Sequence, residues 1–265
     1  MIRSFRAELL KLRRPSIIYG GSAALVGFTL LATVLTITTA TKTLAPPTPG
    51  RGQAATFGQL AETGGLTLGF SNAAALIGVI VLVLFATSIT AEYGQGTVRT
   101  MLIRQPGRVR LLAGKLAALL ACVAAALLVT EIISMIAAVV LARTRDIPTT
   151  QWFTAAALGN AAGDYANALF AAAMFGIFGT ALGVLLRSTP LALSIGLAWL
   201  LPLENIMSNS WSDAGRWLPG LLSRAIGSGD TTVVSYERAV TLIAIYAAVA
   251  LVVASISFVR RDVTT

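Results

Sequence analysis

Histidine is absent from the 265-residue chain, and cysteine occurs once, as Cys122. Without histidine, the sequence excludes Ser-His-Asp and Cys-His nucleophiles and the HExxH zinc motif. A single cysteine excludes an intrachain disulfide, and in an apolar run its thiol behaves as a small hydrophobic group. The sequence therefore predicts no catalytic residues, and no metal or cofactor bound to this chain.

A nucleotide-binding loop is also missing. The nearest pattern is GRVRLLAGK at 107–115, which has six residues between its glycines, and Leu116 follows its lysine. The Walker A loop needs four residues there, so that its backbone N–H groups surround the phosphates, and a Ser or Thr for the magnesium ion. We therefore expect no ATP hydrolysis by this chain.

Charge is scarce: charged residues make up 12% of the chain, against about 25% in soluble domains. Apolar residues make up 56%, and the mean hydropathy is +0.80, which indicates an integral membrane protein. The net charge is +9. The cations flank apolar runs and form no single face, so they indicate membrane topology and not nucleic-acid binding.

Long uncharged runs predict an all-α polytopic protein with six transmembrane helices, because about 20 apolar residues cross a bilayer. The expected spans are 17–39, 70–91, 116–142, 157–186, 190–207 and 239–259. Residues 208–238 form an external segment that either stays outside or re-enters the membrane. With no soluble domain visible, we expect one transmembrane domain over 1–265.

Residues 2–14 have the pattern of a basic amphipathic helix at the membrane surface. Its apolar face consists of Ile2, Phe5, Leu9 and Leu12. Pro15 ends this helix. A signal peptide is the alternative, but the apolar run that follows is too long for an ordinary h-region and lacks a clear A-x-A site.

Basic residues are unevenly distributed between alternate connections. With both termini inside, segments 1–16, 92–115, 187–189 and 260–265 hold 13 of the 20 basic residues. The positive-inside rule therefore places both termini and the 92–115 segment in the cytoplasm. Arginine outnumbers lysine 17 to 3. This is compatible with a GC-rich bacterial genome, so we expect a multi-pass protein of a bacterial cytoplasmic membrane.

The 92–115 segment has the character of a short helical loop. Gly94 and Gly96 permit a turn, Thr97 is suited to cap a helix, and Pro106-Gly107 ends it. The apolar face between them consists of Val98, Met101 and Leu102. Such a helix suits docking into the groove of a soluble partner. A linker that only follows the lipid surface is the alternative.

Three segments together resemble the type-2 ABC transporter permeases, the membrane subunits of bacterial exporters. In that family the loop after the second span carries Glu, Gly-Thr, Leu, Pro, Arg and Lys at similar spacings. The matching residues are Glu92, Gly96, Thr97, Leu102, Pro106, Arg110 and Lys115. Residues 8–14 resemble the family's elbow helix, and residues 258–263 resemble its ending. Drug and peptide-antibiotic exporters are the nearest branch.

The resemblance implies a permease that forms a homodimer and docks two copies of a separate ABC ATPase, which binds the ATP and Mg. It also implies a coupling role for residues of the loop. These are Glu92, Gly96, Thr97, Arg99, Leu102, Pro106 and Arg110. The rival hypothesis from a different class is a non-transporting membrane adaptor or immunity protein, which would tolerate disruption of this loop.

Polar residues within the spans predict a substrate path, because charges in a membrane are costly and mark functional sites. The candidates are Glu131, Asp164, Asn167, Glu204 and Asn205. All lie in the outer half by helical rise, which predicts an acidic outward vestibule for a cationic or amphipathic drug, peptide or lipid-like cargo. The alternatives are interfacial residues at helix ends, and an interhelical hydrogen bond for Glu131.

Glycine recurs in the fourth span at positions 176, 179 and 183. The spacing of Gly179 and Gly183 is that of a G-x-x-x-G motif, which permits close approach of two helices. We expect packing within one subunit, with a dimer seam as the alternative.

Overall fold

Helices make up nearly all of the chain that the structure, a computed structural model, describes. It describes residues 15–42, 55–97, 107–228 and 233–260, with the backbone alone at 15–19 and 228. The expected helix at 2–14, residues 98–106 of the loop and the ending at 261–265 lie outside these ranges. No strand forms among the described residues, where one isolated bridge joins Thr41 to Thr56.

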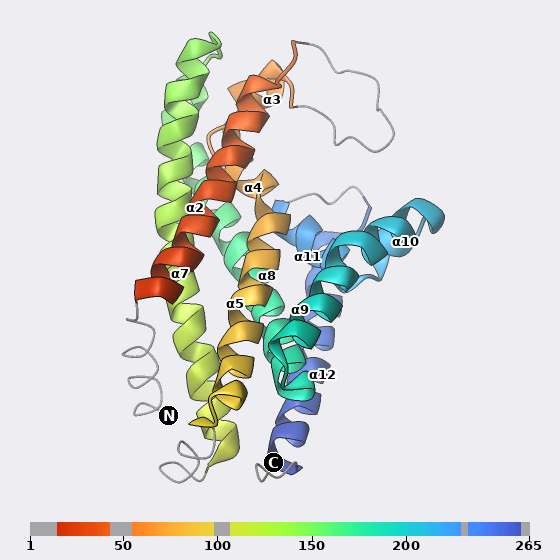
Figure 1. Cartoon of the computed structure of the whole chain (residues 1–265). Coiled ribbons are helices and arrows are strands. Elements are labelled where there is room, and N and C mark those ends of the chain that lie inside the picture. The colour runs from red at the N-terminus through yellow and green to blue at the C-terminus, as the bar shows by residue number, and fades with distance from the viewer. Residues whose placement is uncertain (1–14, 43–54, 98–106, 229–232, 261–265) are drawn as a thin grey trace.

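Six long apolar helices run through the described part of the chain, which confirms the all-helical, six-span expectation (Figure 1). Five are α2 (Pro15–Thr38), α5 (Ala74–Gly94), α7 (Arg108–Thr144), α8 (Ala155–Leu186) and α12 (Tyr236–Arg260). The remaining helix, Thr189–Ser210, is the fifth span along the chain and consists of α9 (Thr189–Ala198), a π-helical turn η2 (Trp199–Leu203) and α10 (Glu204–Ser210). Short elements connect them: α3 (Phe57–Ala61), α4 (Leu68–Asn72), η1 (Thr150–Phe153), η3 (Ala214–Arg216) and α11 (Pro219–Ser228).

The helix α5 packs along α8 at the centre of the bundle. Glycines make the approach possible: a Cβ at Gly179 would lie 2.4 Å from the carbonyl oxygen of Leu82, and one at Gly176 would lie 2.8 Å from the Phe85 ring. A Cβ at Gly183 would meet Ile89 at 2.9 Å. The glycine spacing therefore serves packing within one chain, as expected from the sequence.

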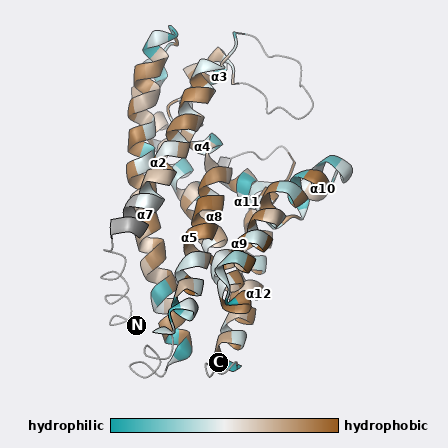
Figure 2. Ribbon diagram, in the orientation of Figure 1, coloured by the Kyte–Doolittle hydropathy of each residue, from teal (hydrophilic) through white to brown (hydrophobic). Residues whose placement is uncertain are grey.

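The long helices consist largely of hydrophobic residues along their length (Figure 2). On α7 the side chains of Ile132, Ile136 and Val140 are 48%, 61% and 58% exposed, and on α12 Val249 and Val252 are similarly exposed. Such a continuous apolar face on a folded chain requires an apolar surrounding, and lipid supplies it. The helices thus bury polar groups inside and present hydrocarbon outside.

The helix α7 is longer than a bilayer requires. It has 37 residues, and at about 1.5 Å per residue it spans roughly 55 Å, against a hydrocarbon core of about 30 Å. It begins at Arg108, eight residues before the apolar run at 116. The last part of the 92–115 segment is therefore a rigid extension of the third span.

The segment 208–238 contains the helix α11, which packs against α5, α8 and α12. Leu222 and Ile226 of α11 are fully buried, in a cluster with Ile243 of α12. A Cβ at Gly227 would meet Ala74 at 2.6 Å, so α11 lies close to the start of α5. This short helix is thus an internal part of the bundle.

Candidate functional site

One end of the bundle brings together the end of α5, the start of α7, the turn between α8 and α9, and the end of α12 (Figure 1). An apolar cluster of Ile89, Leu112, Val184, Ala254 and Phe258 forms its core. We call this region the basic end, after Arg108, Arg110, Lys115, Arg187 and Arg260. Residues 98–106 follow α5 and precede α7 in the sequence, so two helices of the basic end flank them.

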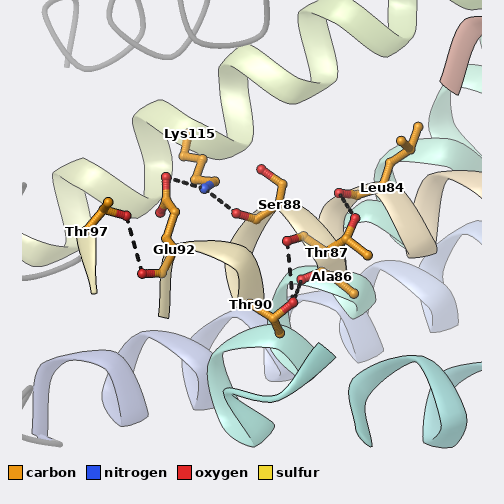
Figure 3. Close-up of polar contacts among 8 residues, drawn as sticks. All are labelled: Leu84, Ala86, Thr87, Ser88, Thr90, Glu92, Thr97 and Lys115. Atoms are coloured by element: carbon orange, nitrogen blue, oxygen red, sulfur yellow. Dashed lines mark hydrogen bonds and ion pairs between the residues drawn. The ribbon is translucent and has the colours of Figure 1, made fainter. Parts of the chain in front are cut away.

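A buried ion pair joins α5 to α7 at the basic end (Figure 3). The Lys115 ammonium lies 2.7 Å from the Glu92 carboxylate and donates a 2.7 Å hydrogen bond to the carbonyl oxygen of Ser88. The Lys115 and Glu92 side chains are 5% and 17% exposed. Because both side chains are poorly hydrated, the pair compensates charges that would be costly to bury singly, and it connects the two helix ends.

Other polar contacts connect the remaining helices to this pair. The Arg108 guanidinium donates to the carbonyl oxygens of Phe258 and Val259, at 3.1 and 3.0 Å, and so caps the end of α12. The Arg187 guanidinium stacks 5.1 Å from the centre of the Tyr93 ring. A 2.7 Å hydrogen bond joins the hydroxyls of Thr90 and Thr189. Five helices therefore meet in one polar network.

Some of the coupling residues predicted from the sequence lie within the described residues, and others lie outside them. Gly96 has a positive φ of 65°, the turn expected of a glycine, and the Thr97 hydroxyl donates to the Glu92 carbonyl oxygen at 3.3 Å (Figure 3). Arg110 is exposed on the first turn of α7. Arg99, Leu102 and Pro106 lie outside the described residues.

Several residues of this network were not identified from the sequence. The missed residues are Thr90, Arg108, Arg187 and Thr189. The only signal in the sequence was the position of each at the end of a span. The two arginines were counted as topology markers and the two threonines were given no role, because a charge count along the chain does not reveal which helix end each side chain reaches. Their partners lie as far as 151 positions away in sequence.

Four of the five polar residues of the expected substrate path fall into two pairs, and Asn167 belongs to neither. Glu131 and Asp164 lie on the neighbouring helices α7 and α8. Glu204 and Asn205 lie together on α10 and line a cavity of about 80 Å³. Asn167 accepts a 2.6 Å hydrogen bond from the Tyr236 hydroxyl. Glu131 and Glu204 are 4% and 1% exposed, so in this conformation neither faces an open vestibule.

Glu204 holds the beginning of α11. Its Oε1 atom accepts hydrogen bonds from the Trp199 indole at 2.7 Å and from the Gly220 backbone N–H at 2.9 Å. A Cβ at Gly220 would overlap the Glu204 carboxylate. The backbone N–H groups in the first turn of a helix have no carbonyl partner within that helix. The Glu204 carboxylate accepts a hydrogen bond from one of them and places a negative charge at the start of α11.

Replacing Glu204 separates its hydrogen-bonding role from its charge. We expect Glu204→Gln to unfold near the parental temperature in detergent, because an amide oxygen accepts the same two hydrogen bonds. Glu204→Ala leaves the Trp199 indole N–H and the Gly220 backbone N–H without this acceptor, and because a buried unpaired N–H group costs about 1–3 kcal/mol, we expect the Tm to fall by roughly 5 °C or more. Equal Tm values for the two variants, measured by intrinsic fluorescence, would contradict this role.

The comparison with protein families agrees with this architecture. Residues 4–159 match the family model described as ABC-2 family transporter protein, which covers well over half of the chain and includes the Glu92–Lys115 pair. No curated protein matches the sequence. The six long apolar helices and the family match together establish that this chain belongs to the ABC-2 family of transporter membrane proteins.

Proposed function

We propose that this chain is the permease subunit of an ATP-driven exporter, which forms the translocation path and is moved by a separate ATPase. Membership of the ABC-2 family implies an ABC ATPase as partner, because the family's membrane component carries no ATPase of its own. In this proposal the ATPase supplies the ATP and Mg. The chain supplies the path and the mechanical connection.

The observation that carries the proposal is the polar network of the basic end. The 98–106 loop is flanked by α5 and α7, whose ends are fixed to one another by Glu92 and Lys115. Arg108 extends the connection to α12, and Thr90 extends it to α9. A displacement of the loop by a docked ATPase would therefore move four helices together. A lipid-surface linker would not need such a connection.

The proposed assembly is a homodimer of this chain with two copies of the ATPase. We place the basic end and both termini in the cytoplasm of a bacterial cell, at the plasma membrane. The excess of basic residues in alternate connections supports this orientation. Docking contacts would come from residues of 92–110, of which Arg110 is exposed at the start of α7.

For the cargo we propose a cationic or amphipathic drug, peptide or lipid-like molecule, as in an antibiotic-resistance efflux system. The support is the set of acidic and amide side chains in the outer half of the helices. Glu204 and Asn205 line a cavity together with Phe175 and Arg224. Asp164 and Asn167 lie on the facing helix α8, and Glu131 lies on α7. A conformational change that opens these helices would expose the carboxylates to cargo.

A Leu102→Asp variant tests the coupling proposal. We expect the tagged parental chain, solubilised in mild detergent, to co-purify with a soluble subunit that hydrolyses ATP, and the variant to lose at least nine-tenths of it. The physical reason is that a buried carboxylate replaces an apolar docking side chain. Leu102→Met is the matched control, because it keeps the apolar volume.

Two results would overturn this function. Recovery of the parental chain without any ATP-binding partner would favour the adaptor or immunity protein. Equal ATPase recovery with Leu102→Asp and Leu102→Met, at equal membrane insertion, would remove the loop from the docking surface.

A further inference from the structure

A polar cluster lies inside the bundle, between α2, α4, α7 and α8. Thr33 and Ser134 share a 2.7 Å hydrogen bond, which joins α2 to α7. The Thr67 hydroxyl donates to Asp164, which joins α4 to α8. A Cβ at Gly69 would collide with Thr33, so α4 also packs directly on α2. We call this set the acid–hydroxyl cluster: Thr29, Thr33, Thr67, Ser71, Glu131, Ser134 and Asp164.

Glu131 is the member that the packing leaves unsatisfied. Its side chain is buried, at 4% exposure, and its Oε1 atom has no hydrogen-bond partner among the described residues. The hydroxyl of Thr29, one helical turn from Thr33, is likewise buried and without a described partner. Burying a carboxylate oxygen or a hydroxyl without a hydrogen-bond partner costs free energy. A ligand bound at this place in the cluster would remove that cost.

The negative charge of the cluster also lacks a nearby positive charge among the described residues. Glu131 lies about one helical turn from Ser134 on α7, and Asp164 lies on α8, which packs against α7. The helices α2, α4, α5 and α8 contain no lysine or arginine. On α7 the nearest cations are Arg143 and Lys115, roughly 18 and 24 Å away along the helix, and Lys115 is paired with Glu92. A buried carboxylate such as Glu131, without a countercharge nearby, is strongly unfavourable.

The other titratable groups near these elements do not supply the missing charge. The Tyr165 hydroxyl of α8 donates a hydrogen bond to the carbonyl oxygen of Ala124. Cys122 lies on α7, nine residues before Glu131. Arg224 of α11 lines the separate cavities beside α10. On α12 the charged residues lie at the two ends, at Glu237, Arg238 and Arg260.

We propose that the acid–hydroxyl cluster binds one small, hard monovalent cation, a sodium ion or a proton, which compensates the charge of Glu131, while Asp164 accepts a hydrogen bond from the Thr67 hydroxyl. Carboxylate and hydroxyl oxygens are the ligands that hard cations prefer. Among the described residues no group of three or more acidic or thiol side chains forms a multivalent metal site, which favours a single charge. The inference concerns the closed conformation and stands whether or not the chain exports cargo.

Thermal unfolding of the purified full-length chain in mild detergent tests the site. The chain is heated at fixed ionic strength in NaCl, KCl or choline chloride, at pH 6 to 9, with tryptophan fluorescence as the readout. A bound sodium ion predicts a saturable rise in Tm with NaCl of at least about 3 °C over choline. A bound proton predicts the same Tm in the three salts and a fall as the pH rises, because the folded state then loses its proton.

The isosteric variant Glu131→Gln/Asp164→Asn is expected to lose either dependence, whereas the exposed-acid control Glu62→Gln keeps it. A parental Tm that depends on neither the salt nor the pH overturns the proposal. So does a dependence that the double variant retains in full. If the double variant does not fold, Glu131→Gln alone is compared with Glu62→Gln, and an unchanged dependence again overturns the site. None of these outcomes involves the ATPase, so they are separate from failure of the proposed function.

Discussion

A Gly179→Leu variant is expected to yield no monodisperse, folded protein, whereas Gly163→Leu on the same helix accumulates normally. The two glycines differ in what a side chain would meet. A Cβ at Gly179 would lie 2.4 Å from the Leu82 carbonyl oxygen and 3.1 Å from the Leu82 Cα atom, whereas at Gly163 nothing lies within 4 Å. Gly163 is also exposed, so its variant adds only lipid-facing or solvent-facing surface.

The physical reason is that the atoms facing Gly179 belong to a backbone. A side chain can rotate away from a new methyl group, as the Phe175 ring beside Gly78 could in part, but the α5 backbone must move as a rigid helix. Moving α5 away from α8 would separate the most extensive helix pair of the bundle and create voids along it. The free energy lost would exceed the marginal stability of most folded proteins.

Size-exclusion chromatography of fluorescently tagged chains in detergent measures this effect directly. The parental chain and Gly163→Leu are expected to give one symmetric peak, and Gly179→Leu to elute in the void volume. A symmetric peak of parental height for Gly179→Leu would mean that α5 and α8 separate without loss of the fold. The proposed packing role of the glycine would then be wrong.

The sequence was sufficient to predict the number and type of the spans. An uncharged run of about 20 residues has few options other than a membrane helix, so the apolar runs of α2, α5, α7, α8 and α12 were visible from composition alone. The turn between α8 and α9 was visible too. Arg187 adopts a left-handed conformation, and Pro190 lies in the first turn of α9.

The exact helix ends were less visible, because they depend on packing. Arg108–Lys115 was treated as loop, yet it forms the first turns of α7, where Leu112 is buried between other helices. Pro202 lies inside the fifth span, in a π-helical turn, and the span continues to Ser210. A local pattern does not reveal that neighbouring geometry accommodates a proline within a helix.

The site was only partly predictable for a related reason. Glu92 was found through its place in a loop pattern, but its ion pair with Lys115 joins two different helices. The burial of Trp152, which is 2% exposed and donates to the Leu60 carbonyl oxygen, likewise requires the helix α3 to pack against η1. Sequence position suggests which residues lie at a membrane boundary, and tertiary structure decides which of them face inward.

A Lys115→Met variant is expected to lower the Tm by roughly 10 °C, because it leaves the Glu92 carboxylate without its ammonium partner in a poorly hydrated place. Removal of one partner of a buried ion pair costs about 3–5 kcal/mol. The double variant Glu92→Gln/Lys115→Met removes both charges, so we expect it to recover at least half of the lost Tm. Arg216→Met is the matched control. It breaks an ion pair whose side chains are about half exposed, and such pairs contribute only about 0–1 kcal/mol.

The same variants distinguish a structural role of the pair from coupling between ATPase and spans. If Glu92 and Lys115 transmit the movement of the docked ATPase, the double variant folds but its complex keeps less than about a tenth of the parental ATP-driven transport, at unchanged ATPase binding. Proteoliposomes containing the assembled complex and a fluorescent cationic cargo supply the measurement. Recovery of both the Tm and the transport rate would show that the pair only stabilises the fold. The mechanical connection would then have to run through Arg108 and the end of α12, whose hydrogen bonds the double variant leaves in place.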